Sequence, residues 1–138
     1  MAESRSKVLL VEDSKFLRIT NGRALAKAGY EVSTAEDGEQ ALQVASDTLP
    51  DIILLDMLIP KLSGPDVLKA LKNNPATMAI PVIVLSSLSQ KNKEKLKEMG
   101  ADEYLEKGSL DLEKHPDRLA TAVEMVLGRC RQRRQTGA

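Results

Sequence analysis

Residues 51–60 read Asp-Ile-Ile-Leu-Leu-Asp-Met-Leu-Ile-Pro. Four consecutive apolar side chains, at residues 52–55, precede the carboxylate of Asp56. A strand with one solvated face alternates apolar and polar residues, whereas a strand covered on both faces is apolar throughout. The stretch therefore predicts a buried parallel strand that ends at an acidic residue.

The same continuous apolar pattern occurs at residues 8–11 and 82–85, and weaker strands are predicted at residues 31–35 and 102–105. Segments with the 3.6-residue apolar spacing of helices lie between these strands. The alternation predicts an α/β fold, a doubly wound five-stranded parallel sheet with helices on both faces. The expected strand order is 2-1-3-4-5, which is flavodoxin-like.

Two of the predicted helices lie at residues 17–28 and 119–127. Asn21-Gly22 is a common turn sequence, but the apolar spacing of residues 17–28 continues through it, and we interpret the segment as one helix. The last helix is the clearest, because apolar residues recur at helical spacing over residues 119–127. That stripe is expected to pack on the sheet.

The composition favours a single intracellular domain. The chain has 138 residues, and its 20 basic and 20 acidic residues cancel, so no overall field favours nucleic acid or membranes. Cys130 has no partner for an internal disulfide, and neither a signal peptide nor a membrane-spanning apolar run is present, which favours the cytoplasm. We predict a disordered N-terminus at residues 1–6, one domain at residues 7–128 and a basic tail or linker at residues 129–138.

Polar side chains collect where the predicted strands end. Glu12 and Asp13 follow the first strand and Asp56 ends the third, so three carboxylates should share one crevice at the switch point of the sheet. Their repulsion should raise at least one pKa unless a cation intervenes, and oxygen-only ligands suit Mg²⁺. Ser86 and Lys107 end the fourth strand and follow the fifth, which adds a hydroxyl and an ammonium. The set is typical of phosphoryl transfer to a carboxylate.

Several stretches resemble the signature segments of response regulator receiver domains. They span residues 7–107 in the family's order and spacing, and it is their combination that is specific. The stretches are Val-Leu-Leu-Val-Glu-Asp-Ser at 8–14, residues 51–60, Gly64, Pro-Val-Ile-Val-Leu-Ser at 81–86, and Gly-Ala-Asp-Glu-Tyr-Leu-Glu-Lys at 100–107.

The resemblance implies a phosphorylation-operated switch of two-component signalling. Asp56 would accept the phosphoryl group from a histidine kinase or a phosphotransfer protein. Asp13, Asp56 and the backbone carbonyl of Leu58 would bind Mg²⁺, for which Mn²⁺ could substitute, and Glu12 would act through water. The protein would be a regulator that assists its own phosphorylation and dephosphorylation rather than an enzyme.

The resemblance also implies how the phosphoryl group is held. Ser86 and Lys107 would contact its oxygens, helped by the backbone N–H groups of Leu58 and Ser87. Tyr104 matches the family's switch aromatic and would move when Ser86 moves. The surface remodelled in this way consists of the fourth helix, predicted at residues 90–99, the fifth strand and the fifth helix.

Three features depart from the family pattern or refine it. Gly108 stands where many receivers have a proline in a cis peptide, so a trans Lys107-Gly108 bond is predicted. The link at residues 109–115 is longer than usual. Leu58 and Leu88, which would overhang the phosphoryl group, cannot hold an attacking water by hydrogen bonding, which predicts slow self-dephosphorylation.

The expected output is contact with a downstream protein on that remodelled surface, and a homodimer is left open. Direct nucleic-acid binding is not expected, because the tail arginines lack a recognition fold. Two other functions remain as alternatives. A degenerate receiver could serve as a scaffold independent of phosphorylation. An aspartate-nucleophile phosphatase would need a second acid where this chain has Leu58.

Overall fold

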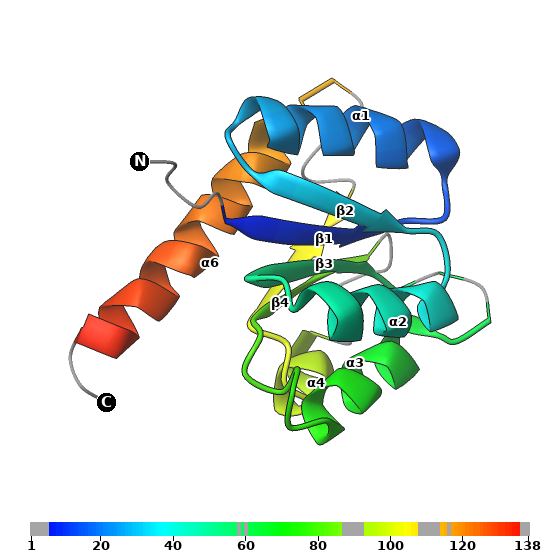
Figure 1. Cartoon of the computed structure of the whole chain (residues 1–138), viewed down its shortest axis with the longest axis vertical. Helices are drawn as coiled ribbons and strands as arrows, with labels where there is room; N and C mark the ends of the chain where they lie inside the picture. Colours follow the sequence, from blue (N-terminus) through cyan, green and yellow to red (C-terminus); the bar gives the residue numbers. More distant parts are fainter. Residues whose placement is uncertain are drawn as a thin grey trace.

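A computed structural model describes residues 6–57, 59, 61–86, 93–107, 114–115 and 117–135. Its centre is a five-stranded parallel sheet in the order β2-β1-β3-β4-β5, which confirms the predicted topology. Figure 1 shows the sheet between layers of helices. The strands are β1 (Lys7–Val11), β2 (Glu31–Ala35), β3 (Ile52–Asp56), β4 (Val82–Ser86) and β5 (Glu103–Glu106).

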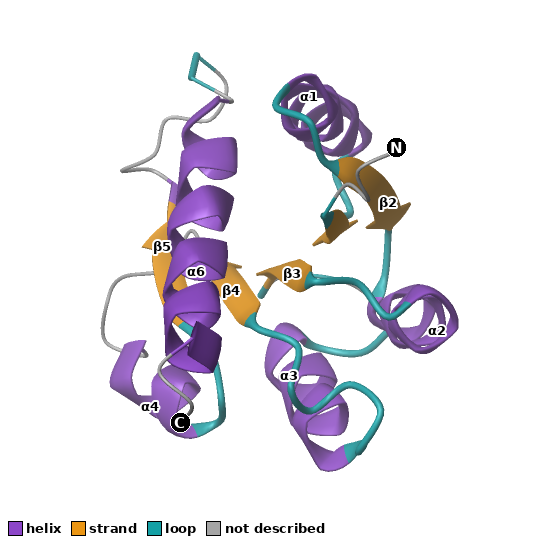
Figure 2. Ribbon diagram, turned by 60° about the vertical axis from the view of Figure 1, so that its left-hand side comes forward, coloured by secondary structure: helices purple, strands orange, loops and turns teal. Residues whose placement is uncertain are grey.

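Helices cover both faces of the sheet, as Figures 1 and 2 show from two directions. One hydrophobic cluster joins the sheet to α1 and α6, and a second cluster joins it to α2 and α3. The helix α4 follows β4 and precedes β5. The helices are α1 (Lys15–Lys27), α2 (Gly38–Thr48), α3 (Gly64–Asn73), α4 (Lys93–Glu98) and α6 (Asp117–Gln135).

The central strands divide their side chains between the two clusters. In β3, Ile52 and Leu54 face α1 and α6, while Ile53 and Leu55 face α2 and α3. Successive residues of a strand point to opposite faces, so a sheet packed on both sides needs apolar residues at every position. The continuous apolar runs are therefore explained by two cores that share one sheet.

The helix α1 runs unbroken through Asn21-Gly22, as predicted. It begins after Ser14, whose side chain accepts a hydrogen bond from the Leu17 backbone N–H. Asn21 is buried, and its side-chain oxygen has no hydrogen-bond partner in the described structure. A buried polar atom without a partner costs roughly 1–3 kcal/mol, so α1 carries both a weak helix former and an unfavourable buried group.

The helix α6 packs on the sheet through Leu119, Val123, Val126 and Leu127, which confirms the predicted stripe. It continues to Gln135, through most of the segment that the sequence assigned to a basic tail. Arg129 Nη2 lies 3.0 Å from Glu103 Oε2 on β5, so this side chain contacts the sheet. In the part of the chain that the structure describes, no helix is both long and apolar enough to cross a bilayer.

Element bounds differ from the predictions by a residue or so. The strand β1 begins one residue earlier, β3 and β4 extend by one residue to Asp56 and Ser86, and β5 is displaced by one residue. The described part of α4 is Lys93–Glu98, within the predicted 90–99. Gly108, most of the link at 109–115, and residues 58, 87 and 88 lie outside the described residues, so predictions about them remain predictions.

Gly22 allows a test of the interpretation of α1. A Cβ built on Gly22 would meet Val32 Cγ1 at 4.0 Å, an ordinary contact, so Gly22→Ala should raise the free energy of unfolding by about 0.5–1 kcal/mol. A Cβ on Gly64 would lie 2.5 Å from Met57 Cα, so Gly64→Ala should lower it. Urea denaturation of both variants measures whether the free energy of unfolding rises in Gly22→Ala and falls in Gly64→Ala. A loss of stability in Gly22→Ala would contradict the assignment.

Candidate functional site

Lys107 joins the ends of three strands. It follows β5 directly, and its Nζ donates hydrogen bonds to Asp56 Oδ2 at 2.7 Å and to Glu12 Oε1 at 3.0 Å. The lysine side chain is 20% exposed, whereas the side chains of Glu12 and Asp56 are 2% and 4% exposed. The structure thus brings together an ammonium and two buried carboxylates that are distant in sequence. This is the grouping expected at the carboxyl edge of the sheet.

Asp13 completes an acidic cluster beside this ammonium. Glu12, Asp13 and Asp56 each offer a carboxylate oxygen, and these oxygens lie within 4.8 Å of one another. Asp13 is exposed, so the cluster opens toward solvent on its side. A hard divalent cation takes oxygen ligands and retains several waters at such an open site. The donor set therefore fits Mg²⁺ or Mn²⁺, although the carbonyl of Leu58 lies outside the described residues.

Burial and mutual repulsion control the charges of the site. Burial raises the pKa of Glu12 to about 7, and the hydrogen bond and negative charge of Asp56 add to the increase. Burial alone would lower the pKa of Lys107, but the hydrogen bonds and negative charges of Asp56 and Glu12 together outweigh burial and hold that pKa above its ordinary value. The predicted pKa increase is therefore present, with burial rather than repulsion as its largest cause.

Ser86 and Tyr104 lie close to this group in the sheet. Asp56 is paired with Leu85, so Ser86 stands one position further along β4 at the same edge. Ser86 is 2% exposed. Tyr104 is paired with Val84 and is buried in the cluster that faces α2 and α3. The structure thus places a buried hydroxyl and a buried aromatic side chain on the strands that flank the site, and Ser87 lies outside the described residues.

Tight backbone packing fixes the chain just after Asp56. The Met57 N–H donates to the Leu85 carbonyl at 3.0 Å, and the Gly64 N–H donates to the Met57 carbonyl at 3.2 Å. Gly64 has no room for a side chain, because a Cβ there would lie 2.5 Å from Met57 Cα. The glycine is therefore required by a close approach of two backbones next to the Asp56 carboxylate.

Arg18, which the sequence analysis did not single out, holds the backbone before α1. Its Nη1 donates to the carbonyl oxygens of Glu12 at 3.0 Å and Asp13 at 3.3 Å, and its Nη2 lies 3.6 Å from Glu36 Oε2. The available signal was an arginine one helical turn after the N-cap Ser14, where a side chain can reach back to the preceding loop. Without the loop's conformation, that spacing alone did not distinguish it from a solvated arginine.

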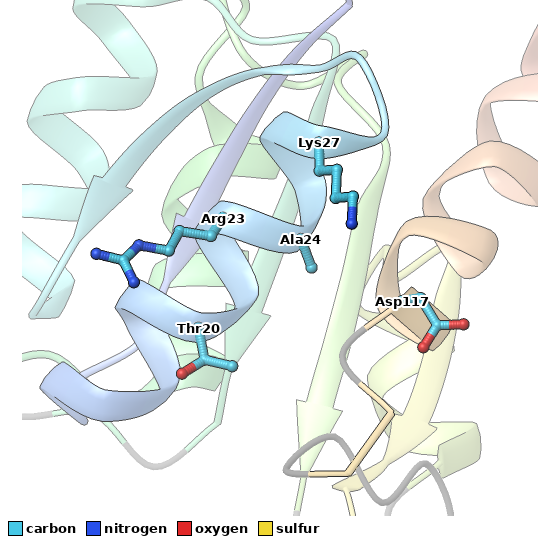
Figure 3. A pocket seen from close by; sticks show the side chains of 5 residues that line it. All are labelled: Thr20, Arg23, Ala24, Lys27 and Asp117. Atoms are coloured by element: carbon cyan, nitrogen blue, oxygen red, sulfur yellow. The ribbon is translucent and has the colours of Figure 1, made fainter.

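A separate hollow of about 380 Å³ lies between α1 and the start of α6. Thr20, Arg23, Ala24, Lys27 and Asp117 line it, and Figure 3 shows Arg23 directed away from Asp117. None of these residues belongs to the acidic cluster. The hollow is therefore a different surface feature from the site at the carboxyl edge of the sheet.

The raised pKa of Glu12 predicts a pH-dependent stability in metal-free buffer. In the folded protein the Glu12 carboxyl has a pKa of about 7, whereas in the unfolded chain its pKa is 4.5. The free energy of unfolding therefore decreases as pH rises between these two values. Glu12→Gln cannot ionise, so its stability relative to the parent should increase as pH rises from 4.5 to 8, by on the order of 1 kcal/mol or more. Urea denaturation with a chelator at both pH values measures this, and a difference that does not grow with pH would contradict it.

Comparisons with known proteins agree with this geometry. Residues 8–123 match the response regulator receiver domain family. The gliding motility regulatory protein of Myxococcus xanthus is 43% identical over 113 residues, which are 81% of this chain and 14% of that protein. The chain therefore spans a small part of that relative.

Solved structures give the same result. The chemotaxis response regulator CheY4 of Vibrio cholerae has a TM-score of 0.80 at 31% identity, covering 89% of this chain and 99% of that one. A manganese-bound form of the response regulator Rcp1 has a TM-score of 0.70 at 31% identity, and the match covers 83% of this chain and 91% of that one. With the family matched over most of its length, the chain belongs to the receiver domains of two-component response regulators.

Proposed function

We propose that Asp56 accepts a phosphoryl group from the phosphohistidine of a histidine kinase or phosphotransfer protein, and that the modification switches the domain's contacts with a downstream protein. One observation carries this proposal: the buried Asp56 carboxylate lies 2.7 Å from the Lys107 ammonium and within one cluster with Glu12 and Asp13. A nucleophile, a fixed cation and a set of metal ligands are the parts that phosphoryl transfer to a carboxylate requires.

In the transfer, one oxygen of Asp56 forms a bond to phosphorus while the donor's phosphorus–nitrogen bond breaks and the imidazole leaves. The residues contribute mainly positions and charges. Lys107 already donates to Asp56, and it would donate to an oxygen of the incoming phosphoryl group. The backbone packing of Met57 against Gly64 holds the nucleophile's neighbour rigidly, which keeps the carboxylate aligned.

A divalent cation would be held by Asp13, Asp56 and the Leu58 carbonyl, with Glu12 acting through water. When bound, it supplies positive charge to the phosphoryl oxygens. Support comes from the spacing of the carboxylate oxygens within 4.8 Å and from the manganese-bound form of the related Rcp1. Mg²⁺ is the proposed ion and Mn²⁺ a substitute.

Phosphorylation would add about −1.5 to −2 charges and three acceptor oxygens to the site. Charge-assisted hydrogen bonds would then draw Ser86 and Lys107 toward the phosphoryl group, with the backbone N–H groups of Leu58 and Ser87. Movement of Ser86 would then open room for Tyr104, which is paired with Val84, two residues before Ser86 in β4. The surface formed by α4, β5 and α6 is the proposed site of the downstream partner.

Mass spectrometry after treatment with acetyl phosphate and Mg²⁺ tests the acceptor. The parent chain should gain the mass of one phosphoryl group, and Asp56→Asn should gain none, because an amide oxygen is a poor nucleophile. Chelation of the metal should abolish the labelling. Asp47→Asn is the matched control, because Asp47 is exposed on α2 and contacts Gln43 rather than the site. Equal labelling of Asp56→Asn would overturn the assignment.

The lifetime of the phosphorylated form tests the roles proposed for Leu58 and Leu88. After the donor is removed, the parent should lose its phosphoryl group slowly, and Leu58→Asn should shorten the lifetime several-fold, because an amide can hold the attacking water. Leu49→Asn is the control, since Leu49 is exposed at the end of α2. Lifetimes from timed mass spectra that are the same in the parent and Leu58→Asn would contradict these roles.

A further inference from the structure

Arg18 contacts the residues of the cation site through their backbone and not through their carboxylates. It lies on α1, and its Nη1 donates to the carbonyl oxygens of both Glu12 and Asp13, at 3.0 and 3.3 Å. The side chain is 18% exposed, so most of it is packed against the protein. A planar guanidinium that donates to two consecutive carbonyls fixes the peptide planes of both residues.

The loop between β1 and α1 is held at both ends, and Arg18 adds a contact to its middle. The Glu12 N–H donates to the Ala35 carbonyl at 2.9 Å, and the Arg18 N–H donates to the Ser14 carbonyl at 2.8 Å, so both ends of the loop are held by backbone hydrogen bonds. Asp13 lies between these ends with its side chain in solvent. Among the residues that the structure describes, Arg18 donates a side-chain hydrogen bond to the backbone carbonyl of Asp13.

We infer that Arg18 is a positioning residue for the divalent cation, an inference that rests on the proposed function. By fixing the backbone of Glu12 and Asp13, it reduces the conformational freedom that their carboxylates lose when a cation binds. Groups that orient metal ligands in this indirect way typically contribute 10- to 100-fold to metal affinity. Arg18 therefore raises affinity for Mg²⁺ or Mn²⁺ without contacting the ion.

The positive charge of Arg18 has the opposite effect, because it repels a cation. Glu36 offsets this repulsion, since its Oε2 lies 3.6 Å from the Arg18 Nη2. Asp13 is exposed, so a cation held beside it would lie near solvent, where charge interactions are weak and screened by salt. The positioning effect should therefore exceed the repulsion, and the two effects predict opposite changes when the arginine is replaced.

Mn²⁺ binding to the full chain tests the inference directly. Electron paramagnetic resonance of free Mn²⁺ gives the dissociation constant with no phosphoryl donor present, so the result does not depend on phosphotransfer. Arg18→Met should weaken binding about tenfold. Arg18→Lys keeps the charge but loses the two-carbonyl contact, and it should lie between Arg18→Met and the parent. Arg23→Met is the matched control, because Arg23 is on the same helix but lines the hollow beside α6 (Figure 3), and it should bind as the parent does.

A second measurement separates positioning from general destabilisation. If Arg18 acts through the cation, acetyl phosphate labelling of Arg18→Met should return to the parent's rate at saturating Mg²⁺, with only the half-saturating Mg²⁺ concentration raised. Parental Mn²⁺ affinity in Arg18→Met, tighter binding, or no binding by the parent would each overturn the inference. If Arg18→Met does not fold, the Mn²⁺ affinity and the Mg²⁺ dependence of labelling are measured on Arg18→Lys. Parental or tighter Mn²⁺ binding by that variant would then overturn the inference. Failure of Asp56 labelling with intact, Arg18-dependent Mn²⁺ binding would refute the proposed function alone.

Discussion

The ammonium of Lys107 between Glu12 and Asp56 is the interaction on which the rest of the site depends. An isolated buried carboxylate is costly, and two neighbouring ones repel each other as well. Both acids are nearly inaccessible to solvent, so their charges must be compensated within the protein, by protonation of Glu12 or by a cation. The lysine achieves this from β5 at the edge of the sheet, and it thereby connects that edge to the first and third strands across β4.

Much of this arrangement could be predicted from the sequence because parallel sheets impose strict geometry. Apolar runs such as Ile52 to Leu55 identify strands covered on both faces, and every such strand ends at the same edge. Once the strand order was assumed, Glu12, Asp56 and Lys107 had to lie near one another. The structure confirms the order, and the contacts of Lys107 with Glu12 and Asp56 follow from it.

Other features depend on contacts that periodicity does not encode. The contribution of Arg18 requires the conformation of the loop before α1, and the pKa of Glu12 depends on how completely the surrounding structure buries it. The part of α6 that extends to Gln135 lacks the apolar stripe by which a helix can be predicted from sequence. Arg129 contacts Glu103 on β5, which is remote in sequence, so the tail could not be distinguished from a linker.

The charges of the site also bear on the cation and the phosphoryl group proposed for it. Three ionised carboxylates opposed by one ammonium would leave two negative charges in a small volume. Burial of Glu12, with a smaller contribution from the charge of Asp56, raises its pKa to about 7 and so limits that excess in the absence of a metal. A divalent cation would neutralise that excess. Phosphorylation would then replace the charge of Asp56 by about −2, so the metal and Lys107 would be needed together. In the proposed function, the excess of acid over base would therefore be the physical reason why metal binding and phosphorylation are coupled.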